Sequence, residues 1–243
     1  MAPVQANARK TSAAKRKPGP RGNPEVTRAA ILEAALHEFA TEGLAGARTD
    51  HIARAAGVNK ALLYYYFEDK ETLYGAALDH VFEALATAIT TVLKRDLPPR
   101  EKVLAAAGAH FDFVAHSPIY PRLVQREMMR AGRAGSPHIR RLVDNFMRPM
   151  MGRWMALLEA GMRSGEFREL DPQNFVLSMV AMNVFYFSSA PVVAELMHAD
   201  PLTPEIVARR RSAVLDLIAA ALFRAPREAT PAPNPKNARG KQP

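Results

Sequence analysis

The chain contains no cysteine among its 243 residues. This absence excludes a disulfide framework, thiol-based redox chemistry and a cysteine-ligated zinc site. No stretch alternates apolar and polar residues in the way a half-buried strand does. Since hydrophobic residues nevertheless make up 48% of the chain, we expect an all-α protein with a sizeable core.

Motifs that carry catalysis are also missing. The sequence has no nucleophile elbow, no His-Glu-x-x-His motif and no glycine-rich phosphate loop. His110 and His116 are six residues apart and fall on different faces of one helix, so they do not form a metal pair. We therefore expect no enzymatic activity, no cofactor and no metal site.

The net charge of +9 is unevenly distributed along the chain. Residues 1–24 hold six basic and no acidic residues, and residues 224–243 hold five basic residues and one glutamate. The intervening residues 25–223 therefore have a net charge of −1. We expect a disordered basic arm over residues 1–23 and a disordered basic tail over residues 224–243. The arm is either a passive tail or a DNA-contacting segment.

The N-terminal arm also bears on the location of the protein. It lacks the apolar segment of a signal peptide and the apolar stripe of a transit peptide. We therefore expect a cytoplasmic protein.

Several helix starts are marked by a capping residue that stands directly before a proline suited to the first turn. Further starts are expected near Thr49, Asn59, Asp69 and Pro99, which gives nine helices in all. The capping pairs are Asn23-Pro24, Ser117-Pro118, Ser136-Pro137, Asp171-Pro172 and Thr203-Pro204.

The sequence pattern of residues 49–70 predicts two short helices joined by a tight turn, followed by the start of a third helix. Thr49 is expected to cap the first of these helices, and Asn59 the second. Leu63 and Phe67 are four residues apart and face the same core. The remainder of the second helix must therefore face outward.

That outward surface has an unusual chemistry. Tyr64, Tyr65 and Tyr66 are adjacent, and a helix places neighbours about 100° apart, so they cannot all be core residues. Together with Lys60 they suit phosphate oxygens and base edges in a major groove. Lys70 begins the next helix, where a phosphate would approach a helix N-terminus. The alternative is a tyrosine cluster that serves some other interface.

This stretch closely resembles the DNA-binding domain of TetR-type transcriptional regulators. The resemblance spans about residues 28–78 with the spacing of the family throughout. The matching residues are Ile31, Ala34, Ala35, Phe39, Gly43, Thr49, Ile52, Ala53, Ala56, Gly57, Val58, Leu63, Tyr64, Tyr66, Phe67, Lys70 and Leu73.

The resemblance implies which residues contact DNA. Lys60, Ala61 and Tyr65 occupy positions that read bases in the family, and the phosphate-contacting positions fall nearby. The complete expected DNA-binding set is Thr49, Asn59, Lys60, Ala61, Tyr64, Tyr65, Tyr66 and Lys70.

A domain boundary is expected after residue 78. Residues 24–78 would form the helix-turn-helix DNA-binding domain, and residues 79–223 a helical ligand-binding and dimerisation domain. The resemblance implies the nine-helix architecture of the family, in which the last two helices pair with their copies in a second subunit. We therefore expect a homodimer.

One run in the second domain raises the question of a membrane. Between Asp171 and Glu195 lie 23 residues without a charge, which is long enough to span a bilayer. The run contains several polar residues and two prolines, and no second such run exists. We therefore interpret it as a helix buried on both sides, with no membrane partner.

A methionine-rich helix over about residues 137–164 is the candidate wall of a ligand cavity. Pro149 should kink or break this helix. Its five methionines are either adaptable core or a malleable wall for an apolar ligand, and Asn183 is either a structural amide or a polar handle. The expected lining residues are Phe111, Val114, Met147, Met151, Trp154 and Asn183.

These features favour a ligand-responsive, homodimeric regulator that binds double-stranded DNA. The favoured mode of action is that of a repressor released from a palindromic operator by a small apolar effector. The alternative is a constitutive or architectural dimeric DNA-binding protein without an effector.

Overall fold

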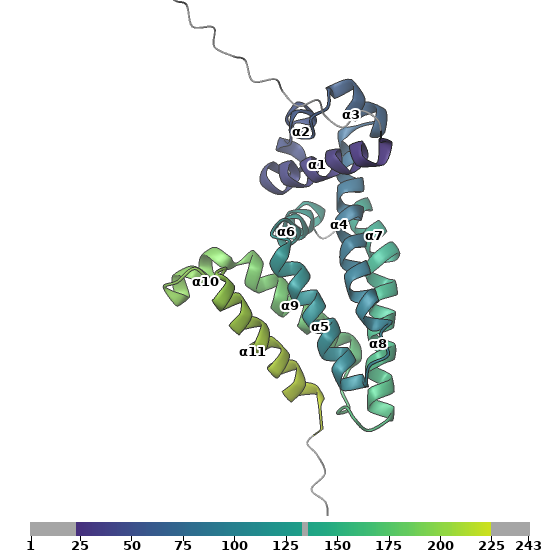
Figure 1. The fold of residues 1–243 in the computed structure, drawn as a ribbon, viewed down its shortest axis with the longest axis vertical. Helices are drawn as coiled ribbons and strands as arrows, with labels where there is room; N and C mark the ends of the chain where they lie inside the picture. Colours follow the sequence, from purple (N-terminus) through teal and green to yellow (C-terminus); the bar gives the residue numbers. More distant parts are fainter. Residues whose placement is uncertain (1–22, 133–135, 225–243) are drawn as a thin grey trace, which may run out of the picture. The chain divides into compact units, whose positions relative to one another are not determined.

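The computed structural model describes residues 23–132 and 136–224. In this part of the chain the helices are joined by turns and loops, and β structure is limited to one isolated bridge between Phe167 and Phe223. The expected basic arm and basic tail lie outside the described residues, except for Asn23 and Arg224. The elements, shown in Figure 1, are α1 (Pro24–Gly46), α2 (Thr49–Ala55), α3 (Lys60–Tyr66), α4 (Lys70–Leu93), α5 (Pro99–His116), α6 (Ile119–Ala131), α7 (Pro137–Leu142), a π-helix (Val143–Met147), α8 (Arg148–Arg163), α9 (Pro172–Ser188), α10 (Ala190–Met197) and α11 (Pro204–Leu222).

The described residues form two compact units. The first contains those up to Glu83 together with those of Arg122–Leu142, and the second contains Ala84–Pro121 and the described residues from Val143 onward. The sequence-based division after residue 78 placed all of 122–142 in the second domain. The structure instead groups this segment with the helices that are expected to bind DNA.

Helix α1 is the first helix of the first unit. The Asn23 side chain caps it by accepting a hydrogen bond from the backbone N–H of Glu25 at 2.9 Å. Ile31, Ala35 and Phe39 are fully buried, as their spacing predicts. The helix bends at Gly43, whose φ of 69° is available to glycine at little cost, and one further turn follows.

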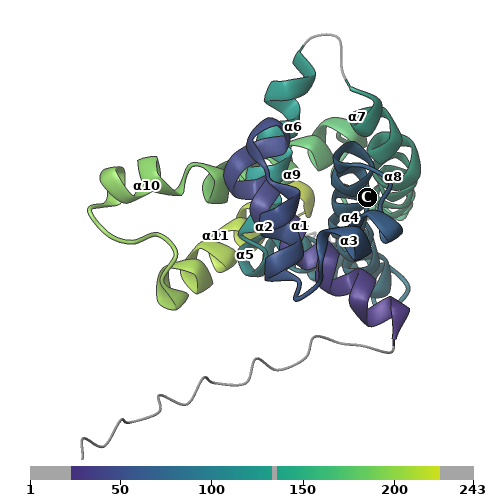
Figure 2. The ribbon, with the colours of Figure 1, turned by 90° about the horizontal axis from the view of Figure 1, so that it is seen from above.

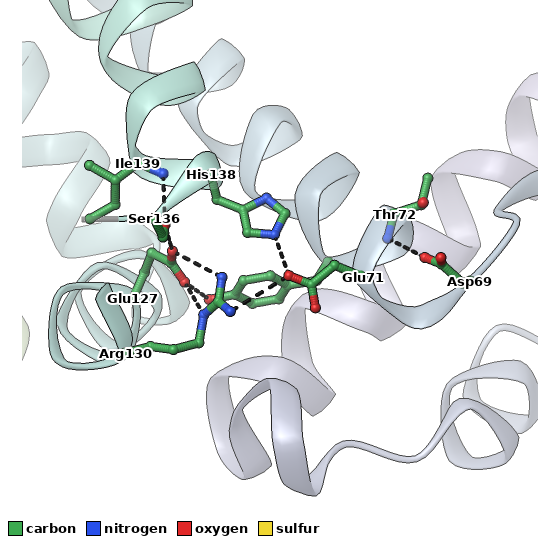
Figure 3. Close-up of polar contacts among 9 residues, drawn as sticks. Asp69, Glu71, Thr72, Glu127, Arg130, Ser136, His138 and Ile139 are labelled. Carbon is green, nitrogen blue, oxygen red and sulfur yellow. Dashed lines mark hydrogen bonds and ion pairs between the residues drawn. The ribbon is translucent and has the colours of Figure 1, made fainter. Parts of the chain in front are cut away.

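A buried carboxylate explains why residues 122–142 belong to the first unit (Figure 3). Glu127 of α6 is only 2% exposed. Its carboxylate accepts hydrogen bonds from the Tyr74 hydroxyl at 2.8 Å, from Arg130 Nε at 3.0 Å and from the Ser136 hydroxyl. These partners come from α4, from α6 itself and from the residue that precedes α7, so one charge joins three segments.

Other polar contacts reinforce this junction. His138 Nε2 lies 2.8 Å from a carboxylate oxygen of Glu71, and Arg141 Nε donates to Asp79 at 3.1 Å. Arg126 donates to the backbone carbonyl of Ala40 at 2.9 Å, near the C-terminal end of α1. The end of α6 and helix α7 are thus hydrogen-bonded to α1 and α4.

The second unit is built on α5, α8, α9 and α11. Helix α5 packs against the other three, and α8 packs against α9. Its core includes the fully buried side chains of Phe111, Trp154, Leu158 and Ile218. The sequence predicted a kink or a break near Pro149, and the structure has a five-residue π-helix, Val143–Met147, between α7 and α8. Proline cannot donate the backbone hydrogen bond that a continuous helix needs at this position.

The uncharged run is not a single helix. Helix α9 ends at Ser188, and α10 leaves it at an angle of 75°. Pro191 lies in the first turn of α10, where its missing N–H costs nothing. Figure 2 shows α10 beyond the ends of α9 and α11. This bend and the π-helix give more helical elements than the nine expected.

Helix α4 is long and apolar enough to span a membrane, and 39% of its most apolar 18-residue stretch is buried within the protein. Core helices meet the same criteria, and the buried side chains of α4 are core residues. They are Leu73, Tyr74, Ala77, Leu78, Val81, Phe82, Leu85, Ile89 and Val92.

Replacing Glu127 tests the junction in the first unit. Burial raises the pKa of Glu127, but hydrogen bonds from Arg130, Ser136 and Tyr74 outweigh that effect and hold the pKa below its usual value of 4.5. The charged form therefore stabilises the fold above the unfolded pKa, and this stability is lost as the pH falls through the lower folded pKa. We expect Glu127→Gln to cost about 1–3 kcal/mol at pH 7.

Urea denaturation followed by circular dichroism at pH 7 and at pH 3.5 measures this effect. The difference between Glu127→Gln and the wild type should shrink at the lower pH. The matched control is Glu83→Gln, since Glu83 is exposed, and it should change the stability little at either pH. Equal effects of the two substitutions would contradict a structural role for the buried charge.

Candidate functional site

The helix-turn-helix begins one residue earlier than expected. Arg48, not Thr49, is the N-cap of α2, and its backbone N–H donates to a carboxylate oxygen of Glu38 at 2.9 Å. The hydroxyl of Thr49 instead lies 3.1 Å from the hydroxyl of Tyr64 on α3. The side chain of Thr49 therefore ties α2 to α3 rather than capping α2.

The turn between α2 and α3 follows the sequence-based expectation. Gly57 has a φ of 71°, and the N–H of Val58 donates to the carbonyl of Ala53 at 2.9 Å. Asn59 caps α3, since its side-chain oxygen accepts from the backbone N–H of Leu62 at 2.7 Å. These bonds fix where α3 starts and in which direction it runs.

The inner face of α3 anchors it to the first unit. Leu63 is fully buried, and Phe67, the residue that follows α3, is only 3% exposed. The guanidinium of Arg28 lies over the ring of Phe67, 5.4 Å from its centroid. Because these contacts fix the inner face, the opposite face points to solvent.

The outer face of α3 carries the residues expected to read bases. Lys60 and Ala61 are exposed, and the Tyr65 side chain is 80% exposed. Lys60 Nζ lies 5.9 Å from the centroid of the Tyr64 ring. Tyr66 is half buried. Its ring and that of Tyr65 are nearly perpendicular, with their centroids 5.4 Å apart. One ammonium group, two accessible phenols and a small alanine therefore share one surface.

This surface matches the chemistry of a duplex. An α-helix fits the B-DNA major groove, where lysine donates to guanine and an apolar contact suits the thymine methyl group. Tyrosine hydroxyls can donate to phosphate oxygens. The exposed side chains of α3 therefore can contact both base edges and backbone.

Lys70 has a structural role that the sequence did not predict. Its Nζ donates to the backbone carbonyls of Ala45 and Ala47, at 3.2 and 3.3 Å, just where α1 ends. The N-cap position before it is occupied by Asp69, whose carboxylate accepts from the backbone N–H of Thr72 at 2.7 Å. That hydrogen bond holds the pKa of Asp69 below its usual range. Lys70 thus holds the end of α1 and has one donor left for a phosphate.

Two exposed arginines of this region were not among the predicted residues. Arg48 precedes α2 and Arg54 lies in its last turn, and their guanidinium groups are 3.4 and 3.8 Å from the carboxylate of Asp50. The only sequence signal for them is their position beside the helix-turn-helix. Their shared acidic partner reduces the positive charge that they present.

The residues expected to line a ligand cavity lie in the second unit. Phe111 and Val114 on α5, Trp154 on α8 and Asn183 on α9 are fully buried, and these three helices pack against one another. Met147, in the π-helix, and Met151, on α8, are half buried. The half-buried methionines and the fully buried residues thus belong to the same group of packed helices.

Asn183 has a partner that the sequence did not predict. Its Nδ2 lies 2.9 Å from Nδ1 of His110 on α5, and both side chains are buried. Burial lowers the pKa of His110 to about 4. The pair is separated by 73 residues in sequence, so local patterns could not have revealed it.

Comparisons with known proteins agree with this geometry. A model of bacterial regulatory proteins of the tetR family matches residues 31–77, and a model of the tetracyclin repressor-like C-terminal domain matches residues 99–218. The HTH-type transcriptional regulator RutR of Escherichia coli (strain K12) is 30% identical over 164 residues, which cover 68% of this chain and 75% of RutR. The HTH-type transcriptional repressor SCO4008 of Streptomyces coelicolor is 35% identical over 116 residues, covering 48% of this chain and 57% of SCO4008.

Solved structures show the same fold. The transcriptional regulator SCO4942 from Streptomyces coelicolor has a TM-score of 0.64 at 27% identity, covering 82% of this chain and 99% of that one. The transcriptional regulator FadR from Bacillus subtilis, in complex with stearoyl-CoA, has a TM-score of 0.61 at 20% identity, covering 79% of this chain and 98% of FadR. With its helix-turn-helix and its C-terminal domain both matched, this chain belongs to the TetR family of bacterial transcriptional regulators.

Proposed function

We propose that this protein is a homodimeric, cytoplasmic repressor that binds a palindromic operator through α3 and is released by a small apolar effector. The observation that carries the proposal is the outer face of α3, where Lys60, Ala61 and Tyr65 are exposed on a helix with a buried inner face. Ala61 is exposed, and the described contacts of Lys60 and Tyr65 are with the neighbouring rings of Tyr64 and Tyr66, so the chemistry of these side chains is available for DNA.

The proposed division of labour follows from position. Lys60, Ala61 and Tyr65 would contact base edges, because they are exposed on the outer face of α3. Thr49 and Tyr64 are hydrogen-bonded to each other and would contact phosphates, whose recognition needs donors but no sequence information. The rest of the set would support these contacts: Tyr66 and Lys70 at phosphates, and Asn59 as the cap that sets the start of α3.

A dimer is favoured by apolar side chains that the single chain leaves exposed. Phe185 on α9 is 68% exposed, and Leu217 on α11 is 57% exposed. Both helices are among the last ones of the chain, which the family resemblance assigns to the dimer. A second copy would cover these exposed side chains, and a twofold-symmetric protein matches a palindromic site.

The effector proposal rests on the apolar interior of the second unit. Phe111, Val114 and Trp154 are buried there, and the half-buried Met147 and Met151 can adapt to a ligand. An apolar lining favours an apolar ligand, because burying an unpaired charge is costly. If no small molecule weakened operator binding, the protein would be a constitutive DNA-binding dimer instead.

Lys60→Ala should separate base reading from phosphate contact. We expect it to cost about 1–3 kcal/mol of affinity for an operator recovered by selection, with little effect on a random duplex. The matched substitution is Lys70→Ala, which should weaken both duplexes equally and also lower the thermal stability, since Lys70 holds the end of α1. Fluorescence anisotropy with the two duplexes over a range of salt concentrations measures the affinities. An equal loss on both duplexes from Lys60→Ala would remove Lys60 from base readout.

Phe185→Arg should disrupt the dimer. It would place a charge in a dry interface, at a cost of several kcal/mol. Light scattering should then report a monomer, while Met129→Arg, at a 77% exposed position on α6, should leave the dimer intact. A wild-type dimer with Phe185→Arg would move the interface away from α9.

A further inference from the structure

The His110–Asn183 pair leaves two polar atoms without a partner among the described residues. His110 is 1% exposed and Asn183 is fully buried, yet His110 Nε2 and Asn183 Oδ1 make no hydrogen bond there. A buried polar group without a hydrogen bond destabilises the fold. Two such atoms on one hydrogen-bonded pair therefore call for a function or a bound molecule.

The hydrogen bond within the pair fixes the character of the free atoms. The Asn183 amide nitrogen can only donate, so His110 Nδ1 is the acceptor at 2.9 Å. A neutral imidazole then carries its hydrogen on Nε2. The pair consequently offers one free donor, His110 Nε2–H, and one free acceptor, Asn183 Oδ1.

The surroundings of the pair are apolar. Phe111 is next to His110 in sequence, and the centroid of its ring lies 5.4 Å from that of Phe187 on α9. Met179, one turn before Asn183, is buried. Burial alone lowers the pKa of His110 to about 4, so its imidazole is neutral at pH 7. A carboxylate ligand would find no positive charge on this pair.

We propose that His110 and Asn183 form the polar end of the effector site, and that the effector is an apolar molecule carrying an uncharged hydroxyl or carboxamide. Such a group accepts from His110 Nε2–H and donates to Asn183 Oδ1, which satisfies both free atoms. The proposal rests on the proposed effector response and names the chemical class of its ligand.

Room for the apolar part of the ligand would come from α8. This helix packs against both α5 and α9 and carries the half-buried Met151 and Met155. Methionine side chains are unbranched and change rotamer easily, so they can move aside for a ring system. Trp154, between these methionines in sequence, would remain the rigid part of the wall.

Three matched probes test the ligand class on the full chain: 2-naphthol, naphthalene and 2-naphthoate. They share one ring system and carry an uncharged hydroxyl, no polar group and a carboxylate, respectively. Equilibrium dialysis at pH 7 should show 2-naphthol binding about tenfold more tightly than naphthalene, which corresponds to one net hydrogen bond. The affinity for 2-naphthoate should be the lowest of the three.

Substitutions then assign the preference to the pair. In His110→Phe and in Asn183→Leu, 2-naphthol should bind no more tightly than naphthalene, whereas Gln173→Leu, at an exposed position of α9, should keep the tenfold preference. Equal binding of 2-naphthol and naphthalene by the wild type, tighter binding of 2-naphthoate, or no binding of any probe would overturn the proposal. So would a preserved preference in both pair variants.

Operator binding keeps this test separate from the proposed function. Without a probe, the wild type and all three variants should bind the selected operator with the same affinity, because the substituted residues belong to the second unit. Failure of the wild type to bind DNA would overturn the proposed regulator. Normal DNA binding without a hydroxyl preference would overturn only the role of His110 and Asn183, and would make them a structural core pair.

Discussion

The burial of Leu63 and Phe67 is the interaction on which the DNA-binding surface depends. Helix α3 has only seven residues, and a helix of that length is not stable in water by itself. Its conformation therefore depends on the buried Leu63, on the buried Phe67 that follows the helix, and on the Asn59 cap. Because the inner face is fixed, Lys60 and Tyr65 face solvent, where their described contacts are with the rings of Tyr64 and Tyr66. A rigid helix loses little entropy on entering a groove.

The same unit extends beyond the helix-turn-helix through its buried charge. Glu127 accepts hydrogen bonds from Tyr74, Arg130 and Ser136, so α4, α6 and the start of α7 cannot separate without exposing or orphaning that carboxylate. Residues that are distant in sequence therefore belong to the first unit. A conformational change at the C-terminal end of α6 would act on the same unit that contains α3.

Local signals predicted most of the architecture, and long-range contacts escaped prediction. The caps at Asn23 and Asn59 and the break near Pro149 depend on a few neighbouring residues, so the sequence was sufficient for them. The role of Lys70 at the end of α1, the Glu127 junction and the His110–Asn183 pair each join residues far apart in the chain. No periodicity reports such contacts. The sequence did not predict the bend between α9 and α10, because the uncharged run was interpreted as a single helix. Pro191 instead lies in the first turn of a new helix.

The central claim is that the outer face of α3 reads base edges. Selection of bound sequences from a random duplex library, carried out with the wild type and with Tyr65→Ala, tests it most directly. We expect the wild type to enrich an inverted repeat. Tyr65→Ala should retain the symmetry of that repeat but lose base preference at one position in each half-site. Enrichment of no sequence by the wild type, or an identical consensus from the two proteins, would contradict it.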